Sequence, residues 1–574
     1  MTGADANPYR AAWRGLRGTL ILVGLFSAAV NLLMLTGPIF MLQVYDRVLA
    51  SGSVATLQGL FAIVVVLYAF LGLYDFLRQR LLSRAAHRLD DAVGPHAYRR
   101  WVRSGLGGEK SAGRPMHDLA VVRGFLSSPA VPGFFDLPWV PFYLAIVFLV
   151  HPWLGFLALG GAGIVTAVAL LNQWTTRDAY ARAMSMDGAE SFFVDQSRRN
   201  AEALLPMGMM GAVGDRWRRM HRVGLLTAQD GAERAEGYAA FSKAFRLLLQ
   251  SSLLGLGGYL AIHGDISAGM IVATSIIAGR ALAPIDQVIG QWRGVVRARE
   301  AHRRLGDLLE GEGREPQRMM LPAPKGHLKV SGATKFAPRG EERPDRKPIL
   351  EQISFDLTPG DGLGVIGPSA SGKSSLARLL VGAWRAEAGS VSLDGAAIQH
   401  WDPAQLGRSI GYLPQKLELM AGTIRDNIAR FDPEAKDEDV VAAAKVAGVH
   451  NMILSLPKAY ETEVDPSGNG PLSGGQVQRI GLARAVYGNP AVVVLDEPNS
   501  NLDASGDEAL AAAITHLREK GSTVVVMAHR PSAISAVNKV LVLQEGQVSQ
   551  FGDKAEVLKR ATRPVGAARL EMAG

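Results

Sequence analysis

A chain of 574 residues is too long for one ordinary domain, so two or more domains are expected. Hydrophobic residues make up 48% and charged residues only 20%, a mixture that fits a chain partly in lipid and partly in water. The lack of cysteine excludes disulfides, zinc–thiolate sites and a cysteine nucleophile, whereas the net charge of +8 fits either a nucleic-acid partner or the arginine-rich inner loops of a membrane protein.

About six apolar runs in the first half approach the ~20 residues that a helix needs to cross hydrocarbon. The runs are Thr19–Leu42, Leu57–Leu77, Phe134–Val150, Trp153–Leu171, Phe245–Ile262 and Ile266–Ile289. Arginines precede the first run, as in a secretory signal peptide, but this run is too long for such a core and more runs follow, so a first membrane helix is favoured. Only His151 and Pro152 separate the third and fourth runs, which predicts a tight hairpin.

Arginine gathers in two of the connections between these runs. One group follows the second run and the other lies between the fourth and fifth: Arg78, Arg80, Arg84, Arg88, Arg99, Arg100, Arg103, Arg198, Arg199, Arg216, Arg218, Arg219 and Arg222. The other connections are short and nearly free of basic residues, so both termini are predicted inside, and the positive charge is explained without nucleic acid. Segments 78–133 and 173–243 have few helix breakers, which predicts helices that continue into the cytoplasm.

The composition changes to glycine, proline and charge around Glu312–Lys325, and from about Leu328 short β-branched strands alternate with helices. We therefore predict an α-helical membrane domain over 1–310, a linker over 311–327 and a soluble α/β domain over 328–574.

The second half contains a phosphate-binding loop between an apolar strand and a helical run. The segment from Gly367 to Ser374 matches G-x-x-x-x-G-K-[ST], in which glycine lets the backbone N–H groups surround phosphates at the positive end of a helix. Lys373 is expected to contact the β and γ phosphates, and Ser374 to bind Mg²⁺. The nucleotide-binding residues predicted here are Gly367, Ser369, Ala370, Ser371, Gly372, Lys373, Ser374 and Ser375.

Two adjacent carboxylates, Asp496 and Glu497, end an apolar strand that starts at Ala491. Neighbouring acids at a strand tip repel one another unless a cation is present, although a pair of helix N-caps would also place acids there. Asp496 suits Mg²⁺ or its water shell, and Glu497 suits the base that activates the attacking water.

The segment Leu472–Gln476 reads LSGGQ and lies between the phosphate loop and the two carboxylates. It is the signature of ATP-binding-cassette (ABC) proteins, and the order of the three elements resembles that family. Helical residues follow it, so Ser473, Gly474, Gly475 and Gln476 are expected to face the ATP phosphates.

The resemblance assigns further roles at matching positions. Gln415 resembles the glutamine that senses Mg²⁺ and the attacking water, and His529 resembles the histidine that contacts the γ-phosphate. The segment Ser500–Asp503 resembles the loop that crosses the dimer interface, which adds Asp503 to the nucleotide site. Phe336 stands where these domains often have an adenine-stacking tyrosine, and the segment Asp465–Gly470 lacks the Gly-Glu pair usual before the signature in exporters.

A membrane domain followed by one cassette is the order of an ABC half-transporter, in which each ATP lies between two chains. The resemblance therefore implies a dimer, expected to contain two identical subunits. Local segments resemble the type I protein secretion ATPases: Gln43–Leu49, Phe135–Pro141, Gly279–Pro284 and Pro498–Asp503. About 18 residues precede the first run, which favours the protease, lipase and S-layer branch without an amino-terminal peptidase-like domain.

This resemblance implies an ATPase in the bacterial inner membrane that exports an unfolded protein with a C-terminal secretion signal. The implied partners are a periplasmic adaptor and an outer-membrane channel, and the ATPase domain is expected in the cytoplasm. Arg280, inside the sixth run, contacts substrate in one interpretation and pairs with carbonyls or Asp286, or lies at the membrane edge, in another. The alternatives are a lipid or drug exporter of the same architecture and a membrane-bound cassette ATPase that acts in signalling.

Overall fold

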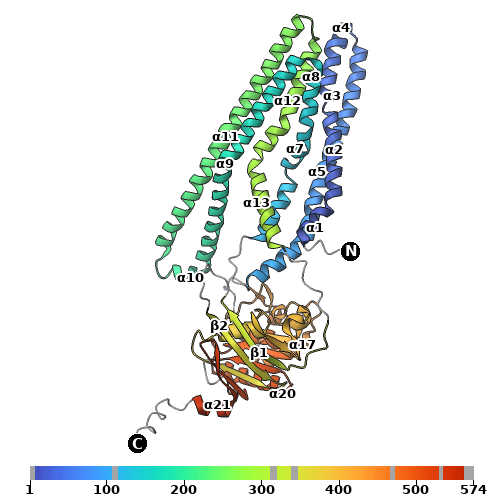
Figure 1. Cartoon of the computed structure of the whole chain (residues 1–574). Helices are drawn as coiled ribbons and strands as arrows, with labels where there is room; N and C mark the ends of the chain where they lie inside the picture. Colours follow the sequence, from blue (N-terminus) through green and yellow to red (C-terminus); the bar gives the residue numbers. More distant parts are fainter. Residues whose placement is uncertain are drawn as a thin grey trace. The chain divides into compact units, whose positions relative to one another are not determined.

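The computed structural model describes residues 7–106, 114–310, 320–337, 347–465, 472–528 and 534–561. The chain forms two compact units, of which one contains the helices α1–α13 and the other contains the elements β1–α21 (Figure 1). This is the predicted class, a helical membrane part followed by an α/β part. Residues 311–319 of the predicted linker lie outside the described residues, so the domain limits stay predictions.

Six helical segments of the first unit are long and apolar enough to cross a membrane, and each overlaps one predicted run. They are Pro8–Ser51, Val54–Ser104, Ala130–Val150, Pro152–Arg199, Met210–Ile262 and Ala268–Gly290. The second, fourth, fifth and sixth are the single helices α5, α9, α11 and α12. The remaining helices include α6 (Pro115–Leu126), α10 (Ala201–Leu204) and α13 (Trp292–Leu308).

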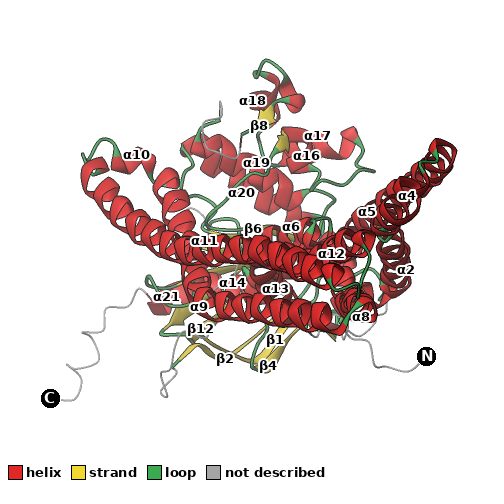
Figure 2. Ribbon diagram, turned by 90° about the horizontal axis from the view of Figure 1, so that it is seen from above, coloured by secondary structure: helices red, strands yellow, loops and turns green. Residues whose placement is uncertain are grey.

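The long helices extend well beyond their apolar runs, as predicted. Helix α5 continues to Ser104 and α9 to Arg199, while α11 begins at Met210. Helices α9 and α11 lie side by side in both views (Figures 1 and 2), with Leu249 of α11 packed where Gly161 of α9 leaves no side chain. The predicted hairpin is confirmed: α8 ends at Val150, and His151 caps α9 by accepting a hydrogen bond from the Trp153 N–H.

Two of the spans are broken, whereas the sequence pattern predicted continuous helices. The first consists of α1 (Pro8–Gly15), α2 (Arg17–Leu33), α3 (Thr36–Gln43), a π-helical turn (Val44–Val48) and α4 (Leu49–Ser51). The third consists of α7 (Ala130–Asp136), a 3₁₀ turn (Leu137–Trp139) and α8 (Val140–Val150). Proline explains the interruption between α2 and α3 and the one between α7 and α8, because Pro38, Pro138 and Pro141 have no N–H to donate to the carbonyl four residues earlier.

The second unit is built on two sheets. A sheet in the order β12-β11-β3-β10-β9-β6 consists of Gln547–Asp553, Lys539–Gln544, Gly362–Ile366, Thr523–Met527, Val492–Asp496 and Ile410–Leu413. An antiparallel sheet in the order β2-β1-β4-β5 consists of Pro348–Leu357, Leu328–Phe336, Ala388–Leu393 and Ala396–Ala397. A short third pair joins β7 (Gly422–Thr423) to β8 (Glu463–Val464).

Helices cover this larger sheet and complete its core. They are α14 (Lys373–Leu380), α15 (Pro403–Ser409), α16 (Ile424–Ile428), α17 (Asp437–Val446), α18 (His450–Leu454), α19 (Gly474–Val486), α20 (Ala504–Glu519) and α21 (Lys554–Ala561). Strands β9 and β10 are buried along their whole length, which explains their runs of valine. Because β3, β6, β9, β10 and β11 are parallel, their carboxyl ends share one edge, where α/β folds bind ligands.

Candidate nucleotide-binding site

The phosphate loop connects the end of β3 to the start of α14, as predicted from its sequence. Gly367 fits only without a side chain, because a Cβ atom would lie 2.1 Å from the Leu543 carbonyl oxygen of β11. Ala370 and Gly372 have φ angles of +64° and +102°, which curve the backbone before the helix begins. The curved loop therefore directs its N–H groups and the amino end of α14 toward one space, the arrangement that binds phosphate.

The Lys373 ammonium folds back over this loop. Its Nζ donates to the carbonyl oxygens of Gly367 and Pro368, at 2.8 and 2.9 Å. Burial lowers the pKa of Lys373, and the carboxylates of Glu497 and Asp496 oppose that shift. The ammonium is thus already oriented across the mouth of the loop, where phosphate oxygens would replace the carbonyls as its acceptors.

Ser374 and Asp496 meet at the carboxyl end of β9. The Ser374 hydroxyl donates to Asp496 Oδ1 at 3.1 Å, and Asp496 is 2% exposed. Burial raises the pKa of Asp496, an effect that the Ser374 hydrogen bond opposes. A hydroxyl beside a buried carboxylate that lacks full compensation is the donor set for a hard cation such as Mg²⁺.

Glu497 follows Asp496 and lies just beyond the end of β9. Its φ angle is +51°, an uncommon conformation for a residue with a side chain, and its N–H donates to the Met527 carbonyl oxygen of β10 at 3.0 Å. Gln415, just beyond the end of β6, donates from Nε2 to Glu497 Oε2 at 2.9 Å. The structure therefore brings together two residues, Gln415 and Glu497, that the sequence assigned to the attacking water.

Gln478 of α19 holds the turn that contains Glu497, and sequence reasoning missed it. Its Nε2 donates to the carbonyl oxygens of Glu497 and Pro498 and to Ser500 Oγ, at 3.3, 2.6 and 3.3 Å, and its Oε1 accepts from the Asn501 N–H at 3.0 Å. Gln478 is 7% exposed. The signal available in the sequence was a glutamine on the same helical face as the apolar residues Leu482 and Ala485, four and seven residues later.

The signature residues start helix α19. Ser473 is its N-cap: its Oγ accepts from the Gln476 N–H at 3.3 Å, and Gln476 Oε1 accepts from the Ser473 N–H at 2.8 Å. A Cβ atom on Gly475 would lie 2.9 Å from the Asn501 carbonyl oxygen, whereas one on Gly474 would meet nothing within 4 Å. Ser473 and Gly474 are exposed, so this helix start remains open to an anion from outside the subunit.

Asp503 is placed at the start of α20. Its side chain accepts from the Gly506 N–H at 2.8 Å, from Ser505 Oγ at 3.0 Å and from Arg479 at 2.6 Å. The bonds to Gly506 and Ser505 lower the pKa of Asp503, and Arg479 acts in the same direction. These contacts fix the loop from Ser500 to Asp503 beside the signature helix, while a contact of Asp503 with nucleotide stays a prediction.

Phe336 is half-buried at the end of β1, where it pairs with Pro348 of β2. A Cβ atom on Gly372 of the phosphate loop would lie within 3.0 Å of Ile349 and Leu350, the next two residues of β2, so Phe336 lies near the phosphate loop. His529 and the segment 466–470 lie outside the described residues. Strand β10, which leads to His529, ends beside Asp496.

Arg280 is exposed on α12, a helix whose other faces are largely buried. The Asp286 carboxylate accepts from Ser242 at 3.0 Å and from Arg246 at 2.8 Å, both in α11. No hydrogen bond or ion pair within the described ranges joins Arg280 to Asp286, so that pairing, one of the structural alternatives, is wrong. A contact of Arg280 with substrate stays a prediction.

The residues at this edge fit a nucleotide triphosphate. Ser371 is 3% exposed, and within the part of the chain that the structure describes its buried hydroxyl has no hydrogen-bond partner, so it is available to a phosphate oxygen. No group of three or more His, Asp or Glu side chains in the described ranges could hold a metal ion by itself. A Mg²⁺ bound through one carboxylate, one hydroxyl and the phosphates of its nucleotide needs no such group.

Comparisons with known proteins agree with this geometry. A family model described as ABC transporter matches residues 350–500. The chain is 44% identical over 564 residues to the type I secretion system ATP-binding protein PrsD of Rhizobium meliloti (strain 1021), covering 98% of this chain and 96% of that protein. It is 27% identical over 547 residues to the leukotoxin translocation ATP-binding protein LktB of Mannheimia haemolytica, covering 93% of this chain and 75% of that protein.

A solved structure, that of a bacterial Atm1-family ABC exporter with ATP bound, resembles the whole chain. The TM-score is 0.78 at 21% sequence identity, and the match covers 96% of this chain and 97% of that one. At this level of identity the likeness shows a shared fold, with a helical membrane part before the nucleotide-binding part.

Proposed function

Because the chain belongs to the type I secretion system ATP-binding proteins, a family of ABC exporters, we propose that it uses ATP to move an unfolded protein out of the cytoplasm. The cargo carries its secretion signal at its C-terminus. The observation that carries this proposal is the nucleotide site at the edge of the β3-β10-β9 sheet, in a chain with six spans and 44% identity to a type I secretion protein over nearly its full length.

The site residues divide into three roles. The loop from Gly367 to Ser375 binds the phosphates, with Lys373 as their counter-charge, and Phe336 stacks on adenine. Ser374, Asp496 and Gln415 would hold Mg²⁺, which would neutralise charge on the phosphates when bound. Glu497 takes the proton of the attacking water, Gln415 orients Glu497, and His529 contacts the γ-phosphate.

Two chains complete each site. The signature residues Ser473, Gly474, Gly475 and Gln476, together with Asp503, act on the ATP bound by a second, identical subunit. The exposure of Ser473 and Gly474 at the start of α19 supports this arrangement, because an exposed helix start can bind an anion held by another subunit.

The chain lies in the bacterial inner membrane as a multi-pass protein, with its termini and its ATPase domain in the cytoplasm. The arginine-rich extensions of α5, α9 and α11 support this orientation, since basic residues collect on the cytoplasmic side. A periplasmic adaptor and an outer-membrane channel carry the cargo onward.

The decisive experiment measures which ligand changes the ATPase rate. The purified full-length chain in lipid nanodiscs is given a synthetic peptide copied from the C-terminus of a type I secretion cargo, its scrambled version, or small hydrophobic compounds. We expect the C-terminal peptide alone to change the ATPase rate. Stimulation by hydrophobic compounds or lipid, with no response to the peptide, would assign the chain to lipid or drug export instead.

A further inference from the structure

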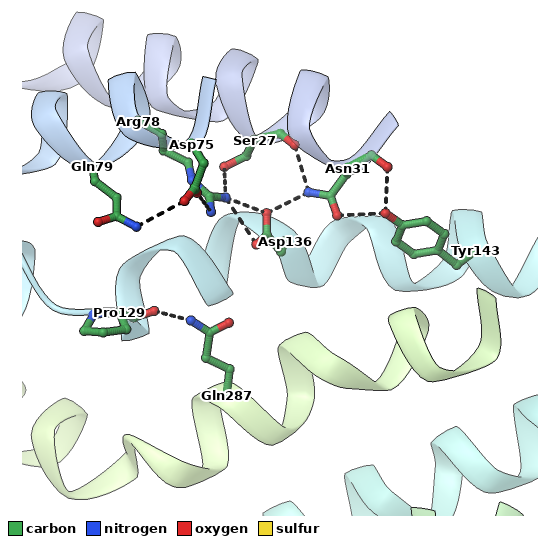
Figure 3. A network of polar contacts seen from close by, with 9 residues as sticks. All are labelled: Ser27, Asn31, Asp75, Arg78, Gln79, Pro129, Asp136, Tyr143 and Gln287. Atoms are coloured by element: carbon green, nitrogen blue, oxygen red, sulfur yellow. Dashed lines mark hydrogen bonds and ion pairs between the residues drawn. The ribbon is translucent and has the colours of Figure 1, made fainter. Parts of the chain in front are cut away.

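A network of polar side chains lies among the helices of the membrane unit (Figure 3). Its centre is Arg78 of α5, which is 6% exposed. Arg78 Nη1 donates to both carboxylate oxygens of Asp136, at 3.1 and 3.2 Å, and to the Ser27 hydroxyl at 3.1 Å. Arg78 directly follows the second apolar run, and burying its charge is costly unless carboxylates compensate it.

The network holds the broken third span on both sides of its break. Asp136 is the last residue of α7, and Tyr143 lies in α8, beyond the 3₁₀ turn with its prolines. Asn31 of α2 contacts both: its Nδ2 donates to Asp136 Oδ1 at 2.7 Å, and the Tyr143 hydroxyl donates to the Asn31 carbonyl oxygen at 2.7 Å. Asn31 therefore links α7 to α8, through its side chain on one side and its carbonyl oxygen on the other.

The amino end of α7 is held from another direction. Gln287 of α12 donates from Nε2 to the carbonyl oxygen of Pro129, at 2.6 Å, just before α7 begins (Figure 3). Helix α7 is thus attached to α5 and α2 at its carboxyl end and to α12 at its amino end. Helix α7 also buries Ala130, Val131, Pro132 and Gly133, so a shift of α7 would change apolar contacts as well as these hydrogen bonds.

Arg78 has a second carboxylate within its own helix. Its Nη2 donates to Asp75 Oδ1 at 2.6 Å, and Asp75 lies three residues earlier in α5. The Asp75 side chain is 37% exposed and the Asp136 side chain 16% exposed. Asp75 moves with Arg78, whereas Asp136 belongs to a different helix, so a shift of α7 would separate Arg78 from Asp136 but not from Asp75.

The second carboxylate lowers the free-energy cost of separating Arg78 from Asp136. Removing the partner of a buried charge is strongly destabilising when the charge is left alone, and much less so when another counter-ion remains. We propose that Arg78 and Asp136 are positioning residues for export: they clamp the broken third span in one stage of the ATP cycle and release it in another, with Asp75 as the counter-ion during release. The proposal rests on ATP-driven export, and it is independent of which cargo is moved.

The chain contains no cysteine, so one introduced thiol reports without background. Ser27 is 1% exposed, and a charged methanethiosulfonate reagent reaches Ser27→Cys only when water enters the network. In the full chain in nanodiscs, we expect labelling about tenfold faster during ATP turnover than without ATP, the change that corresponds to the loss of one hydrogen bond to a charged group. ATP hydrolysis is measured in the same samples, so a failure of the ATPase is distinguished from a failure of the clamp.

Two variants in the Ser27→Cys background separate the roles of the carboxylates. Asp136→Asn weakens the clamp and should raise labelling without ATP to the turnover rate. Asp75→Asn should keep labelling during turnover at the resting rate, because release would leave Arg78 without a counter-ion. In the same background, Arg78→Ala should lose the ATP response, and Arg78→Lys should keep part of it. Equal labelling of Ser27→Cys with and without ATP, or a normal ATP response in Asp75→Asn, would overturn the proposal.

Two controls exclude a general loosening of the fold. Ser275→Cys places the thiol on α12 at a residue that is 5% exposed and outside the network, and neither carboxylate variant should change its labelling. Asp286→Asn removes a different ion pair of the same unit, that with Arg246, and should leave the labelling of Ser27→Cys unchanged. Faster labelling of Ser275→Cys in Asp136→Asn would show that this variant has merely unfolded the helices, and the clamp would then lose its support.

Discussion

The two units of this chain organise their polar residues in opposite ways. In the nucleotide-binding unit, the phosphate loop, the carboxylates and the signature are short continuous segments, each at the end of a strand or the start of a helix. In the membrane unit, Arg78 and Asp136 are 58 residues apart, and Asn31 and Asp136 are 105 apart. Residues that bind one nucleotide together lie in short continuous motifs, whereas residues that hold helices together come singly from several segments.

The comparison is sharpest at Glu497. Glu497→Gln should keep ATP binding but lower hydrolysis about 10²–10⁴-fold, because the general base is lost while the phosphate loop is intact. The measurement is ATPase rate beside nucleotide affinity in the full chain. Glu508→Gln, on the exposed face of α20, is the matched control and should hydrolyse normally. Hydrolysis near the wild-type rate in Glu497→Gln would remove this residue from the base role.

The signature glycines offer a matched pair. Gly475→Ala places a methyl group 2.9 Å from the Asn501 carbonyl oxygen, so it should lower both the melting temperature and the ATPase rate. Gly474→Ala meets nothing within 4 Å in its own subunit, so it should leave the melting temperature unchanged and lower only hydrolysis. The expected loss of hydrolysis is about tenfold or more in each, the size of one or more lost hydrogen bonds to phosphate. Full ATPase activity of Gly474→Ala would argue against an anion at this helix start.

Gln478 tests whether a residue outside every motif belongs to the site. Gln478→Ala removes the contacts that hold Glu497 at its positive φ angle, so kcat should fall about tenfold with little change in the KM for ATP. Gln405→Ala is the control. The Gln405 side chain also makes two hydrogen bonds to backbone, since its Oε1 accepts from the Leu321 N–H and its Nε2 donates to the Leu321 carbonyl oxygen, but it lies away from the site. An equal loss of kcat in both variants would mean that Gln478 serves only the fold.

Sequence patterns predicted the two parts of the chain, the six spans and the place of each nucleotide motif at a strand end or a helix start, because strand burial, span length and phosphate binding each leave a local pattern. They did not predict the breaks of the first and third spans, because the runs were identified by length and hydropathy, which do not register the effect of Pro38, Pro138 and Pro141. They missed Gln478, whose partners are backbone atoms of another segment, and the network around Arg78, which depends on how α2, α5 and α7 pack. Polar contacts between residues far apart in the sequence leave no regular spacing from which they could be predicted.

The smallest effect is expected at Arg280 of the membrane unit. Arg280 is exposed on α12, in a segment that resembles the secretion family. Asp286, the acid considered as its partner, is bound to Arg246 and Ser242 instead. If Arg280 attracts the passing chain, Arg280→Gln should lower export a few-fold, about the effect of one exposed charge, and leave basal ATPase unchanged, while Arg280→Lys should restore export. Export is measured against an intact ATPase rate in the same membranes. Loss of both activities, or of export in Arg280→Lys as severely as in Arg280→Gln, would instead indicate that the planar guanidinium is needed for packing, since a mobile ammonium can replace its charge but not its shape.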